Sequence, residues 1–203
     1  MDNYELYNDI PKEEILLNLT KALEFYHTRF VVEDLEKYNS LISKMLSNAL
    51  PENKKIINEF IYDSTQKQST YILLKNRLVH LFLLEMPIFY FENFTFVLNF
   101  INSVVETRHY YTHYNKSKQY KAMKGTELSI SNSILQTVLE CFILKEIGFK
   151  YNFIDKYKRK CLQQLKRNDI PSRENKYSER YKNINLNTSI ENILKIVTYE
   201  YRI

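Results

Sequence analysis

The sequence predicts an all-α protein, and three observations support this fold class. The 203-residue chain contains two glycines and four prolines, and so few turn and breaker residues argue against an all-β fold. Apolar residues recur at helical spacing along most of the chain. The length fits one domain, or one domain and a small appendage, and is ample for a buried core.

Apolar stripes and breaker residues set the order of the predicted helices. Pro11 suits a first helical position, and Glu13 and Glu14 favour the opening turn, so the first helix begins there. The stripes then predict, in order, an apolar face on that helix up to Phe30, helices over 35–46 and 51–61, a connection at 63–69, a helix from Thr70 that Pro87 stops, and a long helix from Asn93.

Two glycines bracket the next predicted helix. Gly125 suits the left-handed end of a helix, Thr126 suits the N-cap of the helix that follows, and Gly148 ends that helix. Thr188 and Glu191 have capping-box spacing, which predicts a last helix. The chain is therefore divided into an N-terminal extension (1–10), a helical core (11–167), a polar loop (168–187) and a C-terminal helix that docks on the core (188–203).

Composition limits the compartment and the partners. A net charge of +5 favours an acidic partner such as nucleic acid. Cys141 and Cys161 lack the dense spacing of a disulfide framework, and no basic-then-apolar leader opens the chain, so we expect a cytoplasmic protein. The most apolar window, 78–101, is interrupted by acidic residues and a proline, so we expect core helices and no membrane span.

A dense cluster of functional side chains follows the apolar run of the long helix. Glu106, Arg108, His109 and His113 lie within about two helical turns and include two of the chain's four histidines. Arg108 falls on the same helix face as the apolar stripe that ends at Val104, so it extends a buried face. An unpaired buried charge costs several kcal/mol, so Arg108 must pair with a carboxylate such as Glu106 or face a polar cavity.

Arg108 and His113 do not point the same way on an ideal helix. Five residues separate them, which corresponds to about 140° around the helix axis. A shared site therefore needs a local irregularity, a large pocket, or a second copy of the motif across a two-fold axis. Two-fold symmetry is the most economical of these solutions, so we expect a homodimer.

The run Arg108-His-Tyr-Tyr-Thr-His113 resembles the signature of HEPN ribonucleases, which is an arginine, a polar residue, three variable positions and a histidine. Its flanks are similar to the ApeA-like branch of that superfamily over roughly residues 15 to 165. These flanks are Val104-Val-Glu-Thr, Lys124-Gly-Thr-Glu-Leu128, Leu144-Lys-Glu-Ile-Gly-Phe149 and Ala22-Leu-Glu-Phe-Tyr-His27. His109 stands where that branch usually has asparagine.

The resemblance implies a HEPN-like helical bundle, a dimer whose two signatures face each other across a cleft, and RNA cleavage without a metal or other cofactor. The ribose 2′-hydroxyl would attack the adjacent phosphorus, with His113 as general acid or base. Arg108 would hold the scissile phosphate. Supporting roles would fall to His109 and Glu106, and substrate contacts to Tyr114 and Asn115.

The resemblance also bears on regulation. A related group of HEPN toxins carries, two positions after the histidine, a tyrosine that a partner nucleotidyltransferase modifies. That position is Asn115 in this chain, so control by that route is not expected. ApeA-like units typically form the carboxy-terminal part of larger antiviral defence proteins, which implies a role in abortive infection and a sensor domain or regulatory partner.

Two other classes of function are left open. A di-iron bundle would use the Glu-x-x-His pairs Glu24/His27 and Glu106/His109, with Glu59 and Glu85 as further ligands. A zinc site on His109 and His113 lacks a third ligand, and Arg108 would repel either metal.

The other class is a non-catalytic HEPN-like module that binds RNA or a protein. Its contacts would come from the basic segment Lys156 to Lys182, which includes Lys158, Arg159 and Lys160 and the tyrosines Tyr157, Tyr177 and Tyr181. The same segment also fits a solvated helix face and a loop.

Overall fold

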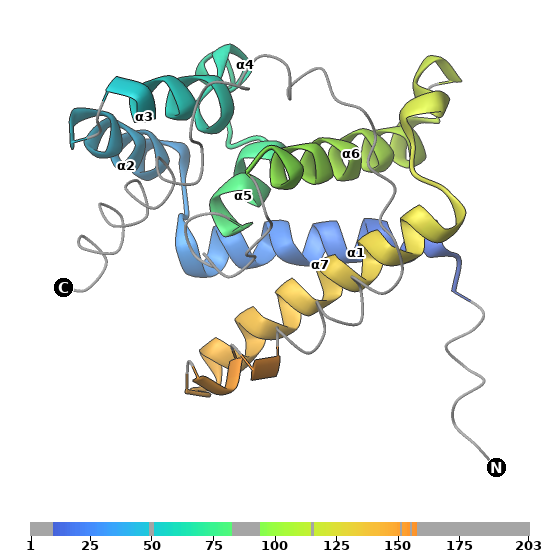
Figure 1. The fold of residues 1–203 in the computed structure, drawn as a ribbon. Coiled ribbons are helices and arrows are strands. Elements are labelled where there is room, and N and C mark those ends of the chain that lie inside the picture. Colours follow the sequence, from blue (N-terminus) through green and yellow to red (C-terminus); the bar gives the residue numbers. More distant parts are fainter. Residues whose placement is uncertain are drawn as a thin grey trace. The chain divides into compact units, whose positions relative to one another are not determined.

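The computed structural model describes residues 10–48, 51–82, 94–114, 116–150, 152–154 and 156–157. Every regular element within these residues is a helix, so the all-α prediction is confirmed (Figure 1). In the same residues, no helix combines the length and the apolar character that a membrane span requires. The predicted loop at 168–187 and the predicted last helix at 188–203 lie outside the described residues.

The chain packs as two compact units. The first unit combines the chain up to Leu23 with a segment that begins at Ser103, and the second contains Glu24–Asn102. Both boundaries fall inside helices, which are α1 (Lys12–Tyr26) and α6 (Phe94–His113).

The first unit contains the start of α1, the end of α6, the 3-10 helix η5 (Lys116–Lys121) and α7 (Gly125–Glu146). The first helix begins where the sequence predicts, because the Ile15 N–H donates to the Pro11 carbonyl at 3.1 Å. The Asn132 side chain donates to the Lys12 carbonyl at 2.8 Å and so ties α7 to this helix start. The core of the unit is made by Leu16, Leu23, Val104, Met123, Leu128, Ile134, Leu135, Val138 and Phe142.

The long helix ends earlier than predicted, and the N-cap of the helix that follows differs from the predicted one. Helix α6 ends at His113, where Tyr114 takes a left-handed φ of 48°, and η5 follows. Gly125 has the predicted left-handed φ of 53°, but it is already the first residue of α7. Lys124 is therefore the N-cap of α7 in place of Thr126, and α7 ends before Gly148 as predicted.

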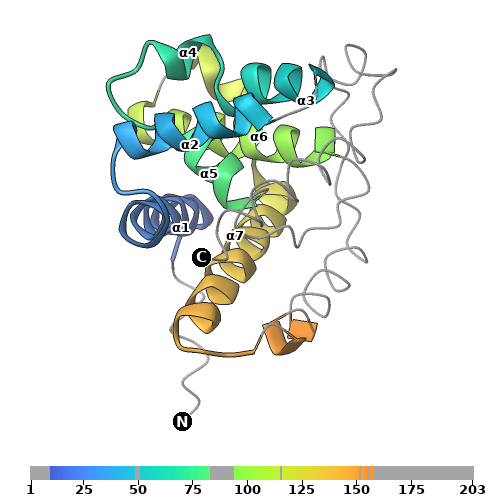
Figure 2. The same cartoon turned by 90° about the vertical axis from the view of Figure 1, so that its left-hand side faces the viewer.

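The second unit contains the end of α1, α2 (Leu35–Asn48), α3 (Pro51–Ile56), α4 (Ser64–Lys67), α5 (Leu74–His80) and the start of α6. Helices α2 and α3 lie side by side in both views (Figures 1 and 2). Each fully buried aliphatic side chain contributes about 1.5–3 kcal/mol. The core is made by Val32, Tyr38, Ile42, Ile57, Ile61, Ile72, Leu78, Val79, Leu81, Phe82, Val97, Leu98 and Ile101.

Two π-helical turns in this unit were not predicted. These are η2 (His27–Val31) and η3 (Ile57–Ile61), which close with hydrogen bonds from Val32 to His27 and from Tyr62 to Ile57. A π-turn holds an extra residue, so it rotates the residues after it relative to an α-helical face. Phe30, which the apolar stripe places in the core, is for this reason exposed.

The segment predicted as a connection at 63–69 contains α4, a single helical turn. Asp63 is its N-cap, and its carboxylate accepts from the Gln66 N–H at 3.0 Å. The same carboxylate pairs with Lys75 at 2.7 Å. The hydrogen bonds of Asp63 therefore stabilise a helical turn within residues 63–69, where the sequence predicted only a connection.

Candidate functional site

The predicted site occupies the last two turns of α6, in the first unit. Val104 is buried, as the stripe predicts, and Arg108 is half-buried one turn later. Glu106 is also half-buried, whereas His109 and His113 are exposed. The cluster is therefore a surface site whose arginine is partly screened from water and whose imidazoles are open to it.

The structure brings His109 next to His113. The two imidazole centroids are 4.7 Å apart, because residues four apart lie on one face of a helix. Helix α6 is continuous over these residues, so Arg108 and His113 project about 140° apart. Of the three solutions considered for a shared site, a local irregularity in α6 is thus not observed.

The connection after the motif is anchored to α6 by Thr107, a residue that the sequence reasoning missed. The buried Thr107 hydroxyl accepts from the Met123 N–H at 2.9 Å and donates to the Ser103 carbonyl at 2.6 Å. The Tyr111 hydroxyl reaches the Met123 carbonyl at 3.5 Å. Thr107 lies three residues after Val104, so helical spacing alone could have placed it on the buried face.

Tyr111 also lies close to the start of α1. Burial, followed by the Glu13 carboxylate, raises the pKa of the Tyr111 phenol. The hydroxyl therefore stays protonated at neutral pH and can donate to Met123. Tyr111 and Thr107 hold one end of the connection in a fixed place beside the motif.

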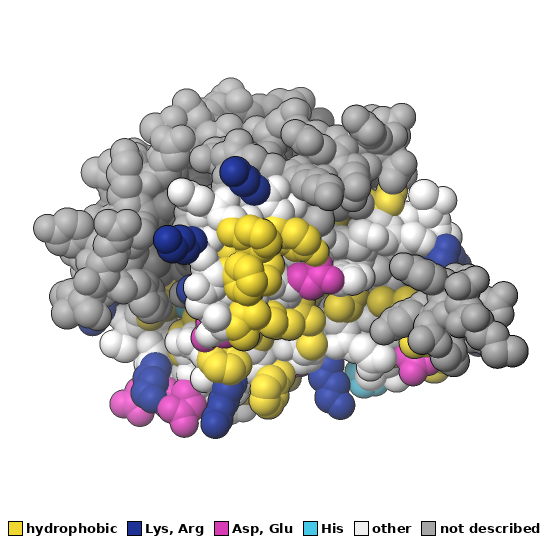
Figure 3. All heavy atoms as spheres, turned by 90° about the horizontal axis from the view of Figure 1, so that it is seen from below, with side chains coloured by type: hydrophobic (Ala, Val, Ile, Leu, Met, Phe, Trp, Pro, Cys, Tyr) yellow, Lys and Arg dark blue, Asp and Glu magenta, His cyan; other side chains and the backbone are white. Residues whose placement is uncertain are grey.

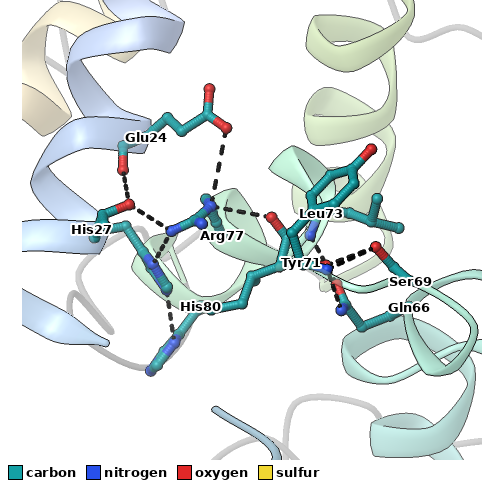
Figure 4. Close-up of polar contacts among 10 residues, drawn as sticks. Glu24, His27, Gln66, Ser69, Tyr71, Leu73, Arg77 and His80 are labelled. Atoms are coloured by element: carbon teal, nitrogen blue, oxygen red, sulfur yellow. Dashed lines mark hydrogen bonds and ion pairs between the residues drawn. The ribbon is translucent and has the colours of Figure 1, made fainter. Parts of the chain in front are cut away.

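A second polar cluster lies in the second unit, around His27 and His80 (Figure 4). Both imidazoles are fully buried, and His27 Nε2 lies 3.0 Å from His80 Nδ1. Arg77 Nη1 lies 3.1 Å from His27 Nδ1 and donates to the Thr28 hydroxyl at 2.7 Å. Arg77 Nε lies 3.9 Å from Glu24 and donates to the Ile72 carbonyl.

The tautomers of this cluster follow from Arg77. A guanidinium only donates hydrogen bonds, so His27 Nδ1 must accept from it and His27 Nε2 must carry the proton. Nε2 then donates to His80 Nδ1. Burial, then the neighbouring His80 and Arg77, lower the pKa of His27 to about 2, and burial lowers that of His80 to about 3. Both imidazoles are neutral at physiological pH.

These contacts disfavour the di-iron reading. Both ring nitrogens of His27 are engaged, and Glu24 faces Arg77. Within the described part of the chain, no three His, Cys, Asp or Glu side chains gather as a metal ligand set. Glu59 lies on η3 in the second unit, and Glu85 is outside the described residues.

Several predicted substrate contacts cannot be placed. Asn115, Lys158, Arg159 and Lys160 lie outside the described residues, as do Tyr177 and Tyr181. Lys156 is exposed. Tyr157, predicted to be available for stacking, is half-buried, and its hydroxyl donates to the Glu140 carboxylate.

A different surface feature lies at the far end of α7. Figure 3 shows hydrophobic side chains gathered on the face seen from below, with charged side chains at their margin. The exposed apolar residues around the end of α7 are Ile143, Ile147, Phe149 and Phe153. Helix α7 has 22 residues, so these residues lie roughly 30 Å along its axis from its start. They are separate from the motif.

Comparison with known protein families gives one match. The family described as Apea-like HEPN matches residues 17–153, which is more than half of the chain and includes the whole cluster from Glu106 to His113. Comparison with curated proteins found no match, and comparison with solved structures found none.

Proposed function

The chain belongs to the Apea-like HEPN family, and from this premise we propose that it is a metal-independent endoribonuclease. The observation that carries the proposal is the placement of the signature on α6. Arg108 is half-buried, and the exposed His113 imidazole packs against His109 at the helix end. A guanidinium that can bind a phosphate and exposed imidazoles near the same helix end are suited to RNA cleavage by acid–base chemistry once a second copy of the signature completes the site.

The chemistry assigns one role to each residue. A base removes the proton of the ribose 2′-hydroxyl, the 2′-oxygen bonds to phosphorus, and the bond from phosphorus to the 5′-oxygen breaks. An acid protonates the departing 5′-oxygen, which leaves a 2′,3′-cyclic phosphate and a 5′-hydroxyl. His113 is the general acid or base of this step. Arg108 holds the phosphate and stabilises its extra negative charge in the transition state.

His109 and Glu106 have supporting roles in this proposal. The His109 ring limits the rotamers of His113 because the two centroids are 4.7 Å apart. A second copy of the chain supplies the other half of the site, because Arg108 and His113 diverge by about 140° on one helix. A role in antiviral defence rests on the resemblance to ApeA-like units alone.

The test is RNA cleavage by the wild type, Arg108→Ala and His113→Ala in the presence of a strong chelator. Arg29→Ala is the matched control, because Arg29 is an exposed arginine outside the signature. We expect the wild type and the control to cleave despite the chelator and both signature variants to lose at least about 100-fold in rate. Products should carry 2′,3′-cyclic phosphates.

Other outcomes would redirect the assignment. Cleavage that chelation abolishes would overturn the metal-independent mechanism. RNA that is bound but left intact by all four proteins would favour the non-catalytic HEPN-like module instead. Cleavage that survives in Arg108→Ala and His113→Ala would show that the signature is not the active site.

A further inference from the structure

The connection between α6 and α7 concentrates positive charge beside the motif. The connection itself, residues 114–124, contains four lysines and no arginine, aspartate or glutamate, and the wider stretch 107–126, which includes the motif, adds Arg108 and again no acidic residue. The formal charge of the wider stretch, +5, equals the net charge of the whole chain, so the other residues balance one another. The local field of this stretch attracts polyanions even though the chain as a whole is only moderately basic.

The connection also presents aromatic rings to solvent. Tyr120 is 77% exposed and Tyr114 is 73% exposed. The Lys121 Nζ lies 5.9 Å from the centroid of the Tyr120 ring, so a cation and a π-face are paired at the surface. A base that stacks on the ring would place its phosphate within reach of such a cation.

Buried residues anchor the connection, and its tyrosines and lysines remain exposed to solvent. Ala122 and Met123 are buried, and Met123 is held by Thr107, by Tyr111 and by a hydrogen bond from Ser131 to its sulfur. Lys116, Lys121 and Lys124 are exposed on either side of this anchor. The surface is thus fixed on the same unit as Arg108 and His113.

We propose that this connection binds single-stranded RNA, with Tyr120 stacking on an unpaired base and Lys116, Lys121 and Lys124 contacting phosphates. The inference rests on the proposed function and extends it to the form of the substrate. Stacking requires an accessible base face, which a duplex does not offer, so paired RNA binds this surface more weakly. Tyr114 and residues 116–124 are then a substrate platform next to the catalytic helix.

The experiment measures equilibrium binding of a short oligouridine strand in the His113→Ala background, which removes cleavage. Tyr120→Ala should weaken binding roughly 5- to 150-fold. Lys121→Gln and Lys124→Gln should each reduce the slope of log K against log salt by about 0.7. An RNA duplex of equal length should bind more weakly than the single strand.

Two matched controls are available in the second unit. Tyr71→Ala removes another exposed tyrosine. Lys67→Gln removes another lysine that lies over a tyrosine ring, 5.5 Å from the centroid of Tyr62. Neither control should change affinity or salt slope.

Three results would overturn the inference. These are unchanged binding by Tyr120→Ala and the lysine variants, equal affinity for the duplex, and displacement of the oligonucleotide by polyglutamate at equal charge concentration. The last would identify the surface as a site for acidic protein. Normal binding by the connection variants in the His113→Ala background, together with cleavage by the protein that retains His113, would overturn this inference and leave the proposed function standing. If the protein does not cleave RNA but binds it in a way that depends on Tyr120, the proposed function would fail and this inference about binding would stand.

Discussion

At the scale of single residues, burial decides how the four histidines behave. His109 and His113 are exposed to solvent on α6. His27 and His80 are fully buried, and their hydrogen bonds use the neutral form of each ring. The first pair is therefore suited to proton transfer, and the second pair to structure.

The buried pair predicts how stability depends on pH. The folded-state pKa values, about 2 for His27 and about 3 for His80, lie below the unfolded value of 6.5. The unfolded chain therefore binds more protons below that value, and the contribution of each histidine is complete above pH 6.5 and lost as the pH falls. The free energy of unfolding should drop by up to about 1.4 kcal/mol per pH unit for each histidine.

Urea denaturation of the wild type and His27→Gln, at a series of pH values from about 7 to about 4.5, would measure this slope. The other groups that face the pair, Glu24, Arg77 and Tyr38, are common to both proteins. The variant should show a shallower slope in this range. Equal slopes in the two proteins would contradict the assignment.

Tyr114 carries backbone strain at the end of α6. Its φ of 48° lies in the left-handed region, which costs a residue with a side chain about 1–2 kcal/mol more than glycine. Tyr114→Gly should therefore be more stable than Tyr114→Ala by about 1 kcal/mol, because both lose the ring and only glycine relieves the strain. Thermal or urea unfolding of the two variants checks this, and equal stabilities would refute it.

At the scale of elements, single polar groups hold helices and connections together. The Ile61 carbonyl, at the end of η3, accepts hydrogen bonds from Tyr38 on α2 and from Asn76 on α5. The Thr107 hydroxyl likewise holds the connection after α6, because it accepts a hydrogen bond from the Met123 N–H. A buried hydrogen-bond partner is left unsatisfied when a side chain such as that of Thr107 is removed.

Thr107→Val should destabilise the first unit by about 1–3 kcal/mol, because the buried Met123 N–H loses its acceptor. Thr137→Val is the matched control, since Thr137 is buried but its hydroxyl donates only to Ser133 of the same helix. Urea unfolding and hydrogen exchange of the Met123 amide would measure both effects. Equal losses in the two variants, with unchanged exchange at Met123, would contradict the anchoring role.

At the scale of the whole molecule, we propose that a second chain completes the site. Arg108 and His113 diverge on one continuous helix, so a two-fold pair of signatures would bring both kinds of side chain to one phosphate.

A subunit-mixing experiment tests this arrangement. Wild-type chains equilibrated with a large excess of His113→Ala chains should lose most of their cleavage rate, because the composite site of a hybrid dimer holds one His113 where the wild-type site holds two. The same excess of Arg29→Ala chains, which are themselves active, should instead raise the total rate in proportion to the total concentration of chains. If the His113→Ala excess has no effect, each chain has a complete site of its own.

Periodicity in the sequence predicted the helices and the location of the signature, because apolar spacing is a local property of the chain. It placed the start of α1, the burial of Val104 and the end of α7 correctly. It could not predict the π-turns that turn Phe30 outward, because an extra residue in a turn depends on packing. It also did not predict that α6 ends at His113, where Tyr114 takes a left-handed φ.

The signature residues, the family and the excess of lysine after the motif could all be read from the order of amino acids alone. Only the tertiary structure could decide that Arg77 and His80, 50 and 53 positions further along the chain, contact His27. These contacts engage the Glu24-x-x-His27 pair that otherwise suggests a metal site. The tertiary structure also decided that Thr107 anchors Met123 and turns Tyr120 and its lysines to solvent. Contacts between distant residues depend on how helices pack, and local spacing carries no information about that packing.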